Sequence, residues 1–347
     1  MAKILVIRFS AIGDVAMSVP VIHSWASQYP QHQIVFLSRP SLAPLFTELP
    51  ENVSFYNADL KGKHKGIGGL YTLFKELQLM KFDVVADLHH VLRSKALAFL
   101  FRLAGTKVCS INKGRWAKRK LVRKRNKILV NQKSSFTRYA EVFEKAGYPV
   151  LLNFTSLYGD SKGNLEAVQH IVGQKGTQKW IGIAPFAKHK GKIYPLELQE
   201  KVVAHFAANP EVRVFLFGGG KEEENCFAEW VNKYPAVVSL TGKLNMSTEL
   251  ALMSHLDVML SMDSANMHLA SLVNIPVVSV WGATHPYAGF MGWKQLPTNA
   301  IQLDMPCRPC SVFGQKPCYR GDYACLNDIK PEKVIEGMDS SAHSDAY

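Results

Sequence analysis

The strongest constraint on the fold is a regular alternation of short apolar runs with helical patterns, which begins at the first residues. Strands that alternate with helices predict βαβ units and a parallel sheet. In the first half the predicted strands are Lys3–Arg8, Gln33–Ser38, Val53–Tyr56, Phe82–Leu88 and Lys107–Ile111, and the predicted helices are Ile12–Ser27, Gly68–Leu79, Leu92–Leu103 and Phe136–Ala146.

A second series of the same kind follows a weakly patterned stretch at residues 148–178. Its predicted strands are Trp180–Ala184, Arg213–Gly218, Val237–Leu240, Val258–Met262 and Val277–Trp281, with helices starting near Leu196, Glu222, Thr248 and Met267. The chain has 347 residues, enough for two domains. We therefore expect an α/β fold of two Rossmann-like domains facing across a cleft, with ligands at the carboxyl ends of the strands.

The expected domains are residues 1–155, residues 156–330 and a C-terminal helix and tail at 331–347. Within the last of these we expect a short helix near Pro331–Gly337, and a frayed tail from Met338 to Tyr347. No apolar run approaches the roughly 20 residues of a transmembrane helix. Arg8 and Asp14 interrupt the N-terminal apolar stretch, so it does not resemble a secretory signal. We expect a cytoplasmic protein.

The charge is unevenly distributed along the chain. Residues 1–160 carry 24 Lys and Arg against 10 Asp and Glu, whereas residues 161–347 carry 17 against 18. Nine of the fifteen residues from Lys113 to Lys127 are basic. This asymmetry predicts an anionic partner, either a lipid surface or a nucleic acid. The run holds one aromatic residue, Trp116, and so lacks the stacking platform expected for single-stranded nucleic acid.

The turn after the first strand carries a carboxylate. It reads Arg8-Phe9-Ser10-Ala11-Ile12-Gly13-Asp14 and has one glycine, not the three of a dinucleotide fingerprint. This argues against an NAD or FAD site. Asp14 is either a candidate catalytic group or a favourable charge at a helix N-terminus.

Two loops of the second half have the composition of a phosphate or sugar site. The loop after Ala184 contains Lys188, Lys190 and Lys192, mobile charges suited to a diphosphate. The turn Gly218–Gly220 precedes three glutamates, which suit ribose or sugar hydroxyls better than phosphate. A solvated loop and a tight turn are the structural alternatives.

The most specific stretch is Asp263-Ser264-Ala265-Asn266-Met267-His268-Leu269-Ala270, followed by Gly282-x-Thr284-x-Pro286. It places a carboxylate, a hydroxyl, amide donors and an imidazole where a strand meets a helix. We interpret it as a ligand site, although a lone helical histidine is more often structural.

Four of the six cysteines, Cys307, Cys310, Cys318 and Cys325, lie within nineteen residues. Their spacing differs from that of a standard zinc ribbon. We expect no metal; zinc ligation by these four is a lesser alternative to free thiols, and disulfides are disfavoured in a reducing compartment.

Together these motifs resemble glycosyltransferase family nine, the ADP-heptose:lipopolysaccharide heptosyltransferases. The resemblance runs from Lys3 to about Ile329 and includes Lys192-Ile193-Tyr194-Pro195 and Cys307-x-Pro309-Cys310. It implies the GT-B architecture and an inverting, metal-independent transferase with no required cofactor. The family often has glycine at the position of Ala265, and some members have hydroxyl residues where this chain has Ala187 and Lys188.

The resemblance also implies residue roles. Asp14 would be the general base and Lys192 would stabilise the leaving diphosphate. ADP-heptose, or a related ADP-sugar, would be the donor. Its expected contacts are Lys188, Gly219, Glu222, Glu224, Leu244, Asp263, Ser264 and His268. The acceptor would be the lipopolysaccharide core or another anionic glycolipid, and its expected contacts are Ser10, Lys61, Lys63, Lys65, Arg115 and Arg119.

We expect a monomer at the inner face of the cytoplasmic membrane, with no nucleic acid partner. Two other hypotheses remain open: a transferase of this fold using a different nucleotide sugar, and a non-catalytic polyanion-binding protein on a degenerate transferase fold.

Overall fold

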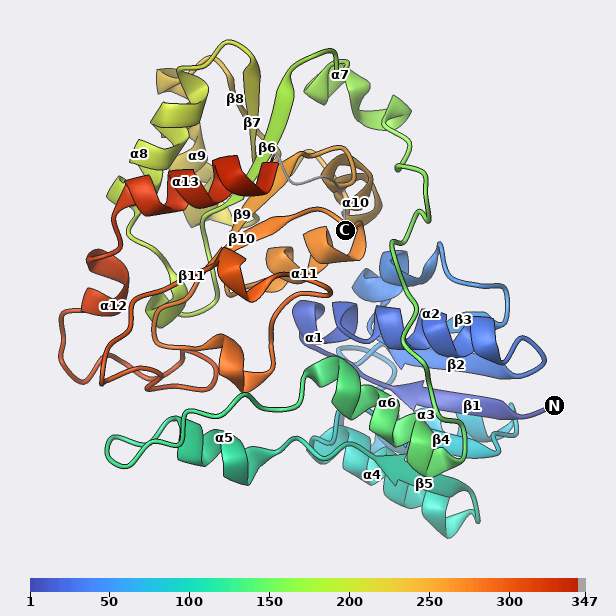
Figure 1. The fold of residues 1–347 in the computed structure, drawn as a ribbon. Helices are drawn as coiled ribbons and strands as arrows, with labels where there is room; N and C mark the ends of the chain where they lie inside the picture. Colours follow the sequence, from blue (N-terminus) through green and yellow to red (C-terminus); the bar gives the residue numbers. More distant parts are fainter. Residues whose placement is uncertain (343–347) are drawn as a thin grey trace. The chain divides into compact units, whose positions relative to one another are not determined.

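The computed structural model describes residues 1–342 and divides the chain into two compact units. Unit 1 comprises residues 1–113 and 133–157, and unit 2 comprises residues 114–132 and 158–347. Each unit has its own parallel sheet (Figure 1). The α/β class with two parallel sheets is therefore confirmed. The predicted boundaries at 155/156 and 330/331 stay predictions, because spatial grouping does not show which part folds alone.

Unit 1 has the sheet order β3-β2-β1-β4-β5, with every neighbouring pair parallel. From β1 the chain passes to β2 and β3 on one side of the sheet, and then to β4 and β5 on the other side of β1. The strand order therefore reverses between β1 and β4, which is the switch point of this sheet. Its elements are β1 (Lys3–Ile7), α1 (Ile12–Ala16), α2 (Val19–Gln28), β2 (Gln33–Ser38), η1 (Pro40–Phe46), β3 (Val53–Asn57), α3 (Gly66–Gln78), β4 (Val84–Asp87), α4 (Leu92–Leu103), β5 (Lys107–Ser110) and α6 (Ser135–Ala146).

Unit 2 has the sheet order β11-β10-β9-β6-β7-β8, again all parallel, with its switch point between β6 and β9. Its elements are α5 (Arg115–Leu121), η2 (Glu166–Val168), α7 (Gln169–Val172), β6 (Lys179–Ala184), η3 (Lys190–Lys192), α8 (Leu196–Ala207), β7 (Val212–Leu216), α9 (Lys221–Lys233), β8 (Val237–Ser239), α10 (Met246–Met253), β9 (Val258–Met262), α11 (Ala265–Leu272), β10 (Val277–Val280), η4 (Pro286–Ala288), η5 (Pro297–Asn299), β11 (Ala300–Ile301), α12 (Ala324–Asn327) and α13 (Pro331–Ala342).

Strands β3 and β5, at the edges of the unit 1 sheet, are partly exposed. The central strands of both sheets are buried apolar runs. In unit 1 the core gathers residues such as Leu5, Val35 and Val85 beneath Leu73 and Leu97 of the covering helices. Parallel strands are covered on both faces, which is why these segments read as continuous apolar runs with no polar alternation. The pattern that predicted the strands from sequence is thus the pattern that buries them.

Two sequence expectations need correction. The helix predicted over Ile12–Ser27 is two helices, because Pro20 has no N–H to donate and the second helix restarts with it in the first turn. The tail predicted from Met338 is helical as far as Ala342, with Met338 fully buried; residues 343–347 lie outside the described part. The basic residues 114–132, which we counted with the first domain, lie with unit 2 in this spatial grouping, which does not test the predicted domain boundaries.

The loop between β6 and α8 is fixed by buried polar groups. Gln199 in α8 is fully buried, and its side-chain amide donates to the carbonyls of Pro185, at 2.9 Å, and Tyr194, at 2.6 Å. The Tyr194 hydroxyl donates to the carbonyl of Ile329 at 2.7 Å. Both ends of this lysine-containing loop are therefore attached to the unit 2 core.

We predict that Gln199→Leu lowers the free energy of unfolding by about 1–3 kcal/mol, because two buried carbonyls lose their donor. Chemical denaturation monitored by circular dichroism measures the change. Lys201→Leu, at an exposed position of the same helix, is the matched control and should leave stability nearly unchanged. Equal stability of the two variants would contradict this role for Gln199.

Candidate functional site

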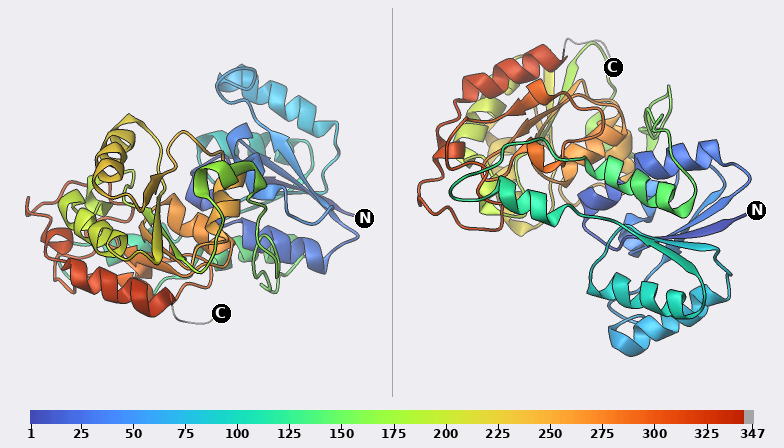
Figure 2. Two further views of the ribbon diagram at one scale, coloured as in Figure 1. Left: turned by 90° about the horizontal axis from the view of Figure 1, so that it is seen from above. Right: turned by 60° about the horizontal axis from the view of Figure 1, so that its bottom comes forward.

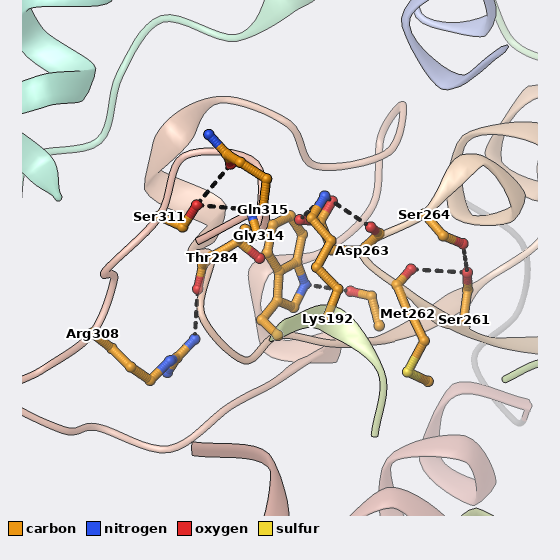
Figure 3. Close-up of polar contacts among 12 residues, drawn as sticks. Lys192, Ser261, Met262, Asp263, Ser264, Thr284, Arg308, Ser311, Gly314 and Gln315 are labelled. Atoms are coloured by element: carbon orange, nitrogen blue, oxygen red, sulfur yellow. Dashed lines mark hydrogen bonds and ion pairs between the residues drawn. The ribbon is translucent and has the colours of Figure 1, made fainter. Parts of the chain in front are cut away.

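A buried ion pair lies at the carboxyl ends of the two central strands of unit 2. Lys192 follows β6 and Asp263 follows β9, and the lysine Nζ lies 2.8 Å from Asp263 Oδ2. The same Nζ donates to the Asp263 carbonyl at 3.1 Å (Figure 3). The side chains are 15% and 5% exposed. The pair is therefore at the switch point, where ligands bind in sheets of this kind.

Close backbone packing holds Lys192 in place. The Gly191 carbonyl accepts from Ala283 N–H at 2.8 Å, which ties the turn η3 to the segment after β10. Gly314 packs on the lysine stem, so that a Cβ there would lie 2.7 Å from Lys192 Cγ, and its φ is +81°. Glycine is needed at position 314 for both conformation and space.

Arg308 ties the C-terminal segment to the same region. It is buried, and its guanidinium donates to the carbonyls of Gly282, Leu303 and Thr284, the last at 2.9 Å. Burial lowers the pKa of Arg308. Neither this arginine nor Gly314 could be assigned a role from the sequence. No local sequence pattern marks them, because only the fold brings residues 308–314 against residues 282–284.

The start of α11 lies beside the ion pair. Ser264 precedes the helix, and its hydroxyl lies 3.1 Å from that of Ser261 in β9. His268 is buried one turn into α11. Asp263, Ser264 and His268 therefore occupy one strand-to-helix junction, as the motif predicted. Their contact with a donor stays a prediction.

In the glycine-rich turn after β7, the N–H of Gly219, an expected donor contact, donates to Glu223 Oε2 at 2.7 Å, and the contact of Gly219 with a donor stays a prediction. Burial raises the pKa of Glu223. Glu222 and Glu224 are exposed in the first turn of α9 and remain available for hydroxyl groups.

Two other donor candidates lie on separate loops of unit 2. Lys188 is exposed in the loop after β6, and Leu244 is half-buried just before α10. In the first turn of α10 burial raises the pKa of Glu249 to about 7. The sequence analysis missed this carboxyl group, whose burial no local pattern reveals.

In unit 1 a second ion pair lies at the carboxyl end of β1. The Arg8 guanidinium contacts Asp14 Oδ2 at 2.9 Å and donates to the Leu88 carbonyl. Arg8 is 5% exposed whereas Asp14 is 35% exposed. Tyr139 donates to the Asp14 carbonyl at 3.2 Å. The aspartate is thus held by Arg8 and Tyr139, and 35% of its side chain reaches solvent. Ser10 is half-buried in the same turn.

His89 is a polar group of this region that sequence analysis missed. It follows β4, and its Nδ1 accepts from Phe9 N–H at 3.3 Å. Burial, aided by the charges of Arg8 and Lys113, lowers the pKa of His89 to about 3. At neutral pH the ring is uncharged, and because Nδ1 is an acceptor its proton is on Nε2.

The lysines expected to bind the acceptor lie on a tight loop before α3. Lys61, Lys63 and Lys65 are all exposed. The Asp59 carboxylate accepts the N–H groups of Lys61, Gly62 and Lys63, and the bonds from Gly62 and Lys63 lower its pKa. This loop therefore has a defined shape. Arg115 and Arg119 are exposed on α5, in unit 2.

Lys63 forms an ion pair with the Glu76 carboxylate. Its Nζ lies 2.7 Å from Glu76 Oε1, and Glu76 Oε2 accepts from the Tyr56 hydroxyl at 2.6 Å. His64 Nδ1 accepts from Asp59 N–H, so His64 Nε2 donates to Glu76 at 3.1 Å. These bonds, from Lys63 first and then Tyr56, lower the pKa of Glu76 to about 2.

The four clustered cysteines lie in the C-terminal segment of unit 2, and whether they ligate zinc stays untested. All are free thiols, and among residues 1–342 no group of three or more His, Cys, Asp or Glu is arranged to hold a metal ion. Cys310 points to the Ala283 carbonyl and Cys318 to Asp322. Cys325 is part of the unit 2 core, where burial raises its pKa to about 11. Besides burial, the neighbouring Cys318 and Cys307 thiols raise the pKa of Cys310, and Cys310, Cys307 and Cys318 contribute to the raised pKa of Cys325. The four thiols therefore lie near one another, and their chemistry stays a prediction.

The two doubly wound parallel sheets are those of the GT-B class of glycosyltransferases. A solved structure of the E. coli ADP-heptose lipopolysaccharide heptosyltransferase II has a TM-score of 0.70 with this chain at 18% identity, covering 99% of this chain and 98% of that one. This likeness supports the fold.

The chain belongs to glycosyltransferase family 9, the heptosyltransferase family, whose model matches residues 70–317. It is 28% identical over 167 residues to lipooligosaccharide heptosyltransferase 2 of Campylobacter jejuni, covering 47% of this chain and about half, 51%, of that relative. It is 25% identical over 310 residues to lipopolysaccharide heptosyltransferase 3 of Escherichia coli, covering 85% of this chain and 88% of the relative.

The helices within residues 1–342 are short. Helices α3 and α9 have 13 residues each, fewer than the roughly 20 of a membrane span. No helix in this part of the chain is both long enough and apolar enough to cross a membrane.

We predict that Glu76→Gln destabilises the protein at neutral pH by about 1–2 kcal/mol. The shift from 4.5 to about 2 sets an upper bound of about 3 kcal/mol, which solvent around Glu76 reduces. Because the folded-state pKa is lowered, this stability is present above pH 4.5 and is lost as the pH falls towards 2. Urea unfolding of both proteins between about pH 7 and pH 2.5 should show the difference shrinking. A pH-independent difference would contradict the argument.

We predict that Gly314→Ala is more destabilising than Gly321→Ala by about 1–3 kcal/mol. The two glycines have nearly equal φ angles, +81° and +83°, so the backbone strain is similar. Only at Gly314 does the added Cβ meet the Lys192 side chain, whereas nothing lies within 4 Å of a Cβ at Gly321. Thermal and urea unfolding measure the difference, and equal losses would show that the contact with Lys192 does not matter.

Proposed function

We propose that this protein transfers a heptose, or a related sugar, from an ADP-sugar to a hydroxyl group of an anionic glycolipid such as the lipopolysaccharide core, with inversion at the anomeric carbon. The observation that carries the proposal is the Lys192–Asp263 pair at the switch point of unit 2. Membership of family 9 supports the reaction class, and the E. coli relative named for ADP-heptose supports the donor.

Unit 2 would hold the donor. Lys192 would face the diphosphate, kept in position by Asp263, and Lys188 would add charge from the same loop. As the bond between the anomeric carbon and the diphosphate breaks, its electron pair leaves with ADP, and a fixed ammonium group stabilises that charge. Asp263, Ser264 and His268 would contact the sugar and phosphates. The ribose and base would lie near Gly219, Glu222, Glu224 and Leu244.

Unit 1 would hold the acceptor. Asp14 would remove the proton from the acceptor hydroxyl as that oxygen attacks the anomeric carbon, which requires unit 1 to bring Asp14 to the sugar. Arg8 suits this role because it orients a carboxylate whose side chain is 35% exposed to solvent. Ser10, Lys61, Lys63 and Lys65 would bind the acceptor and its phosphates, together with Arg115 and Arg119. No metal is needed, because lysine and backbone amides supply the positive charge.

A related enzyme of this fold with another nucleotide sugar is the second candidate, because Ala265, Ala187 and Lys188 differ from residues common in the family. A non-catalytic polyanion-binding protein is the third, supported by the basic run Lys113–Lys127. Donor binding separates all three. Stabilisation by ADP-heptose supports the first, stabilisation by a UDP- or GDP-sugar supports the second, and salt-sensitive DNA binding without any nucleotide-sugar response supports the third.

We predict that ADP-heptose raises the melting temperature more than UDP- or GDP-sugars do, and that Asp14→Asn keeps this response but loses about 10²–10⁴-fold in transfer rate. Transfer is measured as ADP release with a heptose-deficient inner-core acceptor. Asp160→Asn, an exposed aspartate of unit 2, is the matched control. Unchanged turnover of Asp14→Asn would remove Asp14 from the mechanism.

A further inference from the structure

Helix α4 is apolar on its outward side. Leu92, Phe99 and Leu103 are 87%, 55% and 69% exposed, and Ala96 between them is also exposed. At about 100° per residue these four positions fall within about 60° of one another. The opposite side, with Leu97 and Phe101, is buried in the unit 1 core. A surface helix normally presents polar residues outward, so packing against the sheet does not explain this stripe.

Basic residues flank the stripe on both sides. Lys95 and Arg102 fall on one side of it and Arg93 on the other, and all three are exposed. The helix Leu92–Leu103 contains no acidic residue. An apolar stripe between rows of lysine and arginine is the pattern of helices that lie in the interface of an anionic bilayer.

Helix α3 continues this surface. It lies beside α4 (Figure 2). Phe74 of α3 and Phe101 of α4 are in edge-to-face contact, with 5.0 Å between ring centroids. Its outward side presents Ile67, 90% exposed, and Tyr71, 51% exposed. Lys75 Nζ lies 5.5 Å from the centre of the Tyr71 ring. Two neighbouring helices therefore expose large apolar side chains with cations next to them.

We propose that the α3–α4 face, formed by Ile67, Tyr71, Leu92, Phe99 and Leu103 with Lys75, Arg93, Lys95 and Arg102, docks on the surface of an anionic lipid bilayer. The basic residues meet the anionic headgroups, and the apolar side chains enter the headgroup region. The inference extends the proposed function, since a glycolipid acceptor lies in a bilayer, but it does not depend on the donor.

The charge of this face favours lipid over a second copy of the chain. A symmetric dimer built on it would bring Arg93, Lys95 and Arg102 of both copies together without a facing carboxylate on α4. An anionic headgroup layer meets the same cations with opposite charge. The face is therefore matched in charge to a lipid surface and not to itself.

The first experiment measures binding of the full chain to vesicles by co-sedimentation, without any sugar nucleotide. We expect binding to vesicles that contain phosphatidylglycerol, weak binding to pure phosphatidylcholine, and loss of binding in high salt. The triple variant Leu92→Ser, Phe99→Ser, Leu103→Ser should bind at least about tenfold more weakly. The control variant Leu151→Ser, Leu296→Ser, Phe313→Ser changes three other exposed apolar residues and should bind normally.

A second experiment locates the inserted residue. The chain has six tryptophans, and Trp116 is exposed while Trp25, Trp180, Trp230, Trp281 and Trp293 are buried. In the double variant Trp116→Phe, Phe99→Trp, the one exposed tryptophan is on α4. We expect brominated lipids to quench its fluorescence strongly, with a blue shift on binding. Stronger quenching of Trp116 in the wild type than of the tryptophan introduced on α4 would place the contact on α5 and overturn the proposal.

Two further outcomes would overturn it. In the first, the α4 triple variant binds vesicles as tightly as its control variant. In the second, the wild type does not bind vesicles, and light scattering shows that it forms a dimer that the triple variant disrupts. Transfer to a soluble, deacylated acceptor separates this inference from the proposed function. The α4 triple variant should keep this transfer activity. If the transferase proposal is wrong, the wild type shows no transfer to the soluble acceptor but still binds vesicles.

Discussion

The arrangement of unit 2 depends on the ion pair between Lys192 and Asp263. Removing two charges from water is costly, and a pair this well buried persists only when each charge keeps close partners. Lys192 meets this condition with the carboxylate and the carbonyl of one residue. The segments around it are accordingly tight, with glycine at positions 191 and 314 and the Arg308 guanidinium bonded to the adjacent carbonyls. The residues around Lys192 thus keep its positive charge fixed at the switch point of the unit 2 sheet.

The two units use their aspartates differently, although both lie at the carboxyl end of a central strand. Asp263 is almost fully covered and balances a lysine, so its carboxylate serves mainly to hold that charge. Asp14 also has a basic partner, but 35% of its side chain reaches solvent while Arg8 behind it is buried. A carboxylate that is oriented by a buried arginine and partly exposed to solvent is suited to accept a proton from a bound molecule. The different exposure fits the different roles that we propose.

Within residues 1–342, every strand except the two-residue β11, and most helices, could be predicted from the sequence, because a buried parallel strand is a continuous apolar run such as Ile4–Ile7. The break at Pro20 and the helix to Ala342 were missed, since a weak pattern near an end competes with tertiary packing. Asp14, Lys192, Asp263 and His268 could be found from their motifs. Arg308, Gly314, His89 and Glu249 could not, because their roles arise from contacts between segments distant in the sequence or from burial that no local pattern encodes.

The burial of the individual residues of helix α4 could not be predicted from the sequence either. From sequence, Leu92–Leu103 reads as a helix whose apolar residues are interrupted by three basic ones, and this pattern does not show which of the apolar residues are buried. The structure covers only the side with Leu97 and Phe101. The loop with Lys61, Lys63 and Lys65 runs directly into α3, whose outward residues Ile67 and Tyr71 belong to the α3–α4 face. Lysines proposed for acceptor phosphates and side chains proposed for lipid contact are therefore continuous in the chain. A glycolipid bound by this loop would have its acyl chains anchored in the same bilayer that the α3–α4 face contacts, so one orientation of unit 1 would serve both interactions.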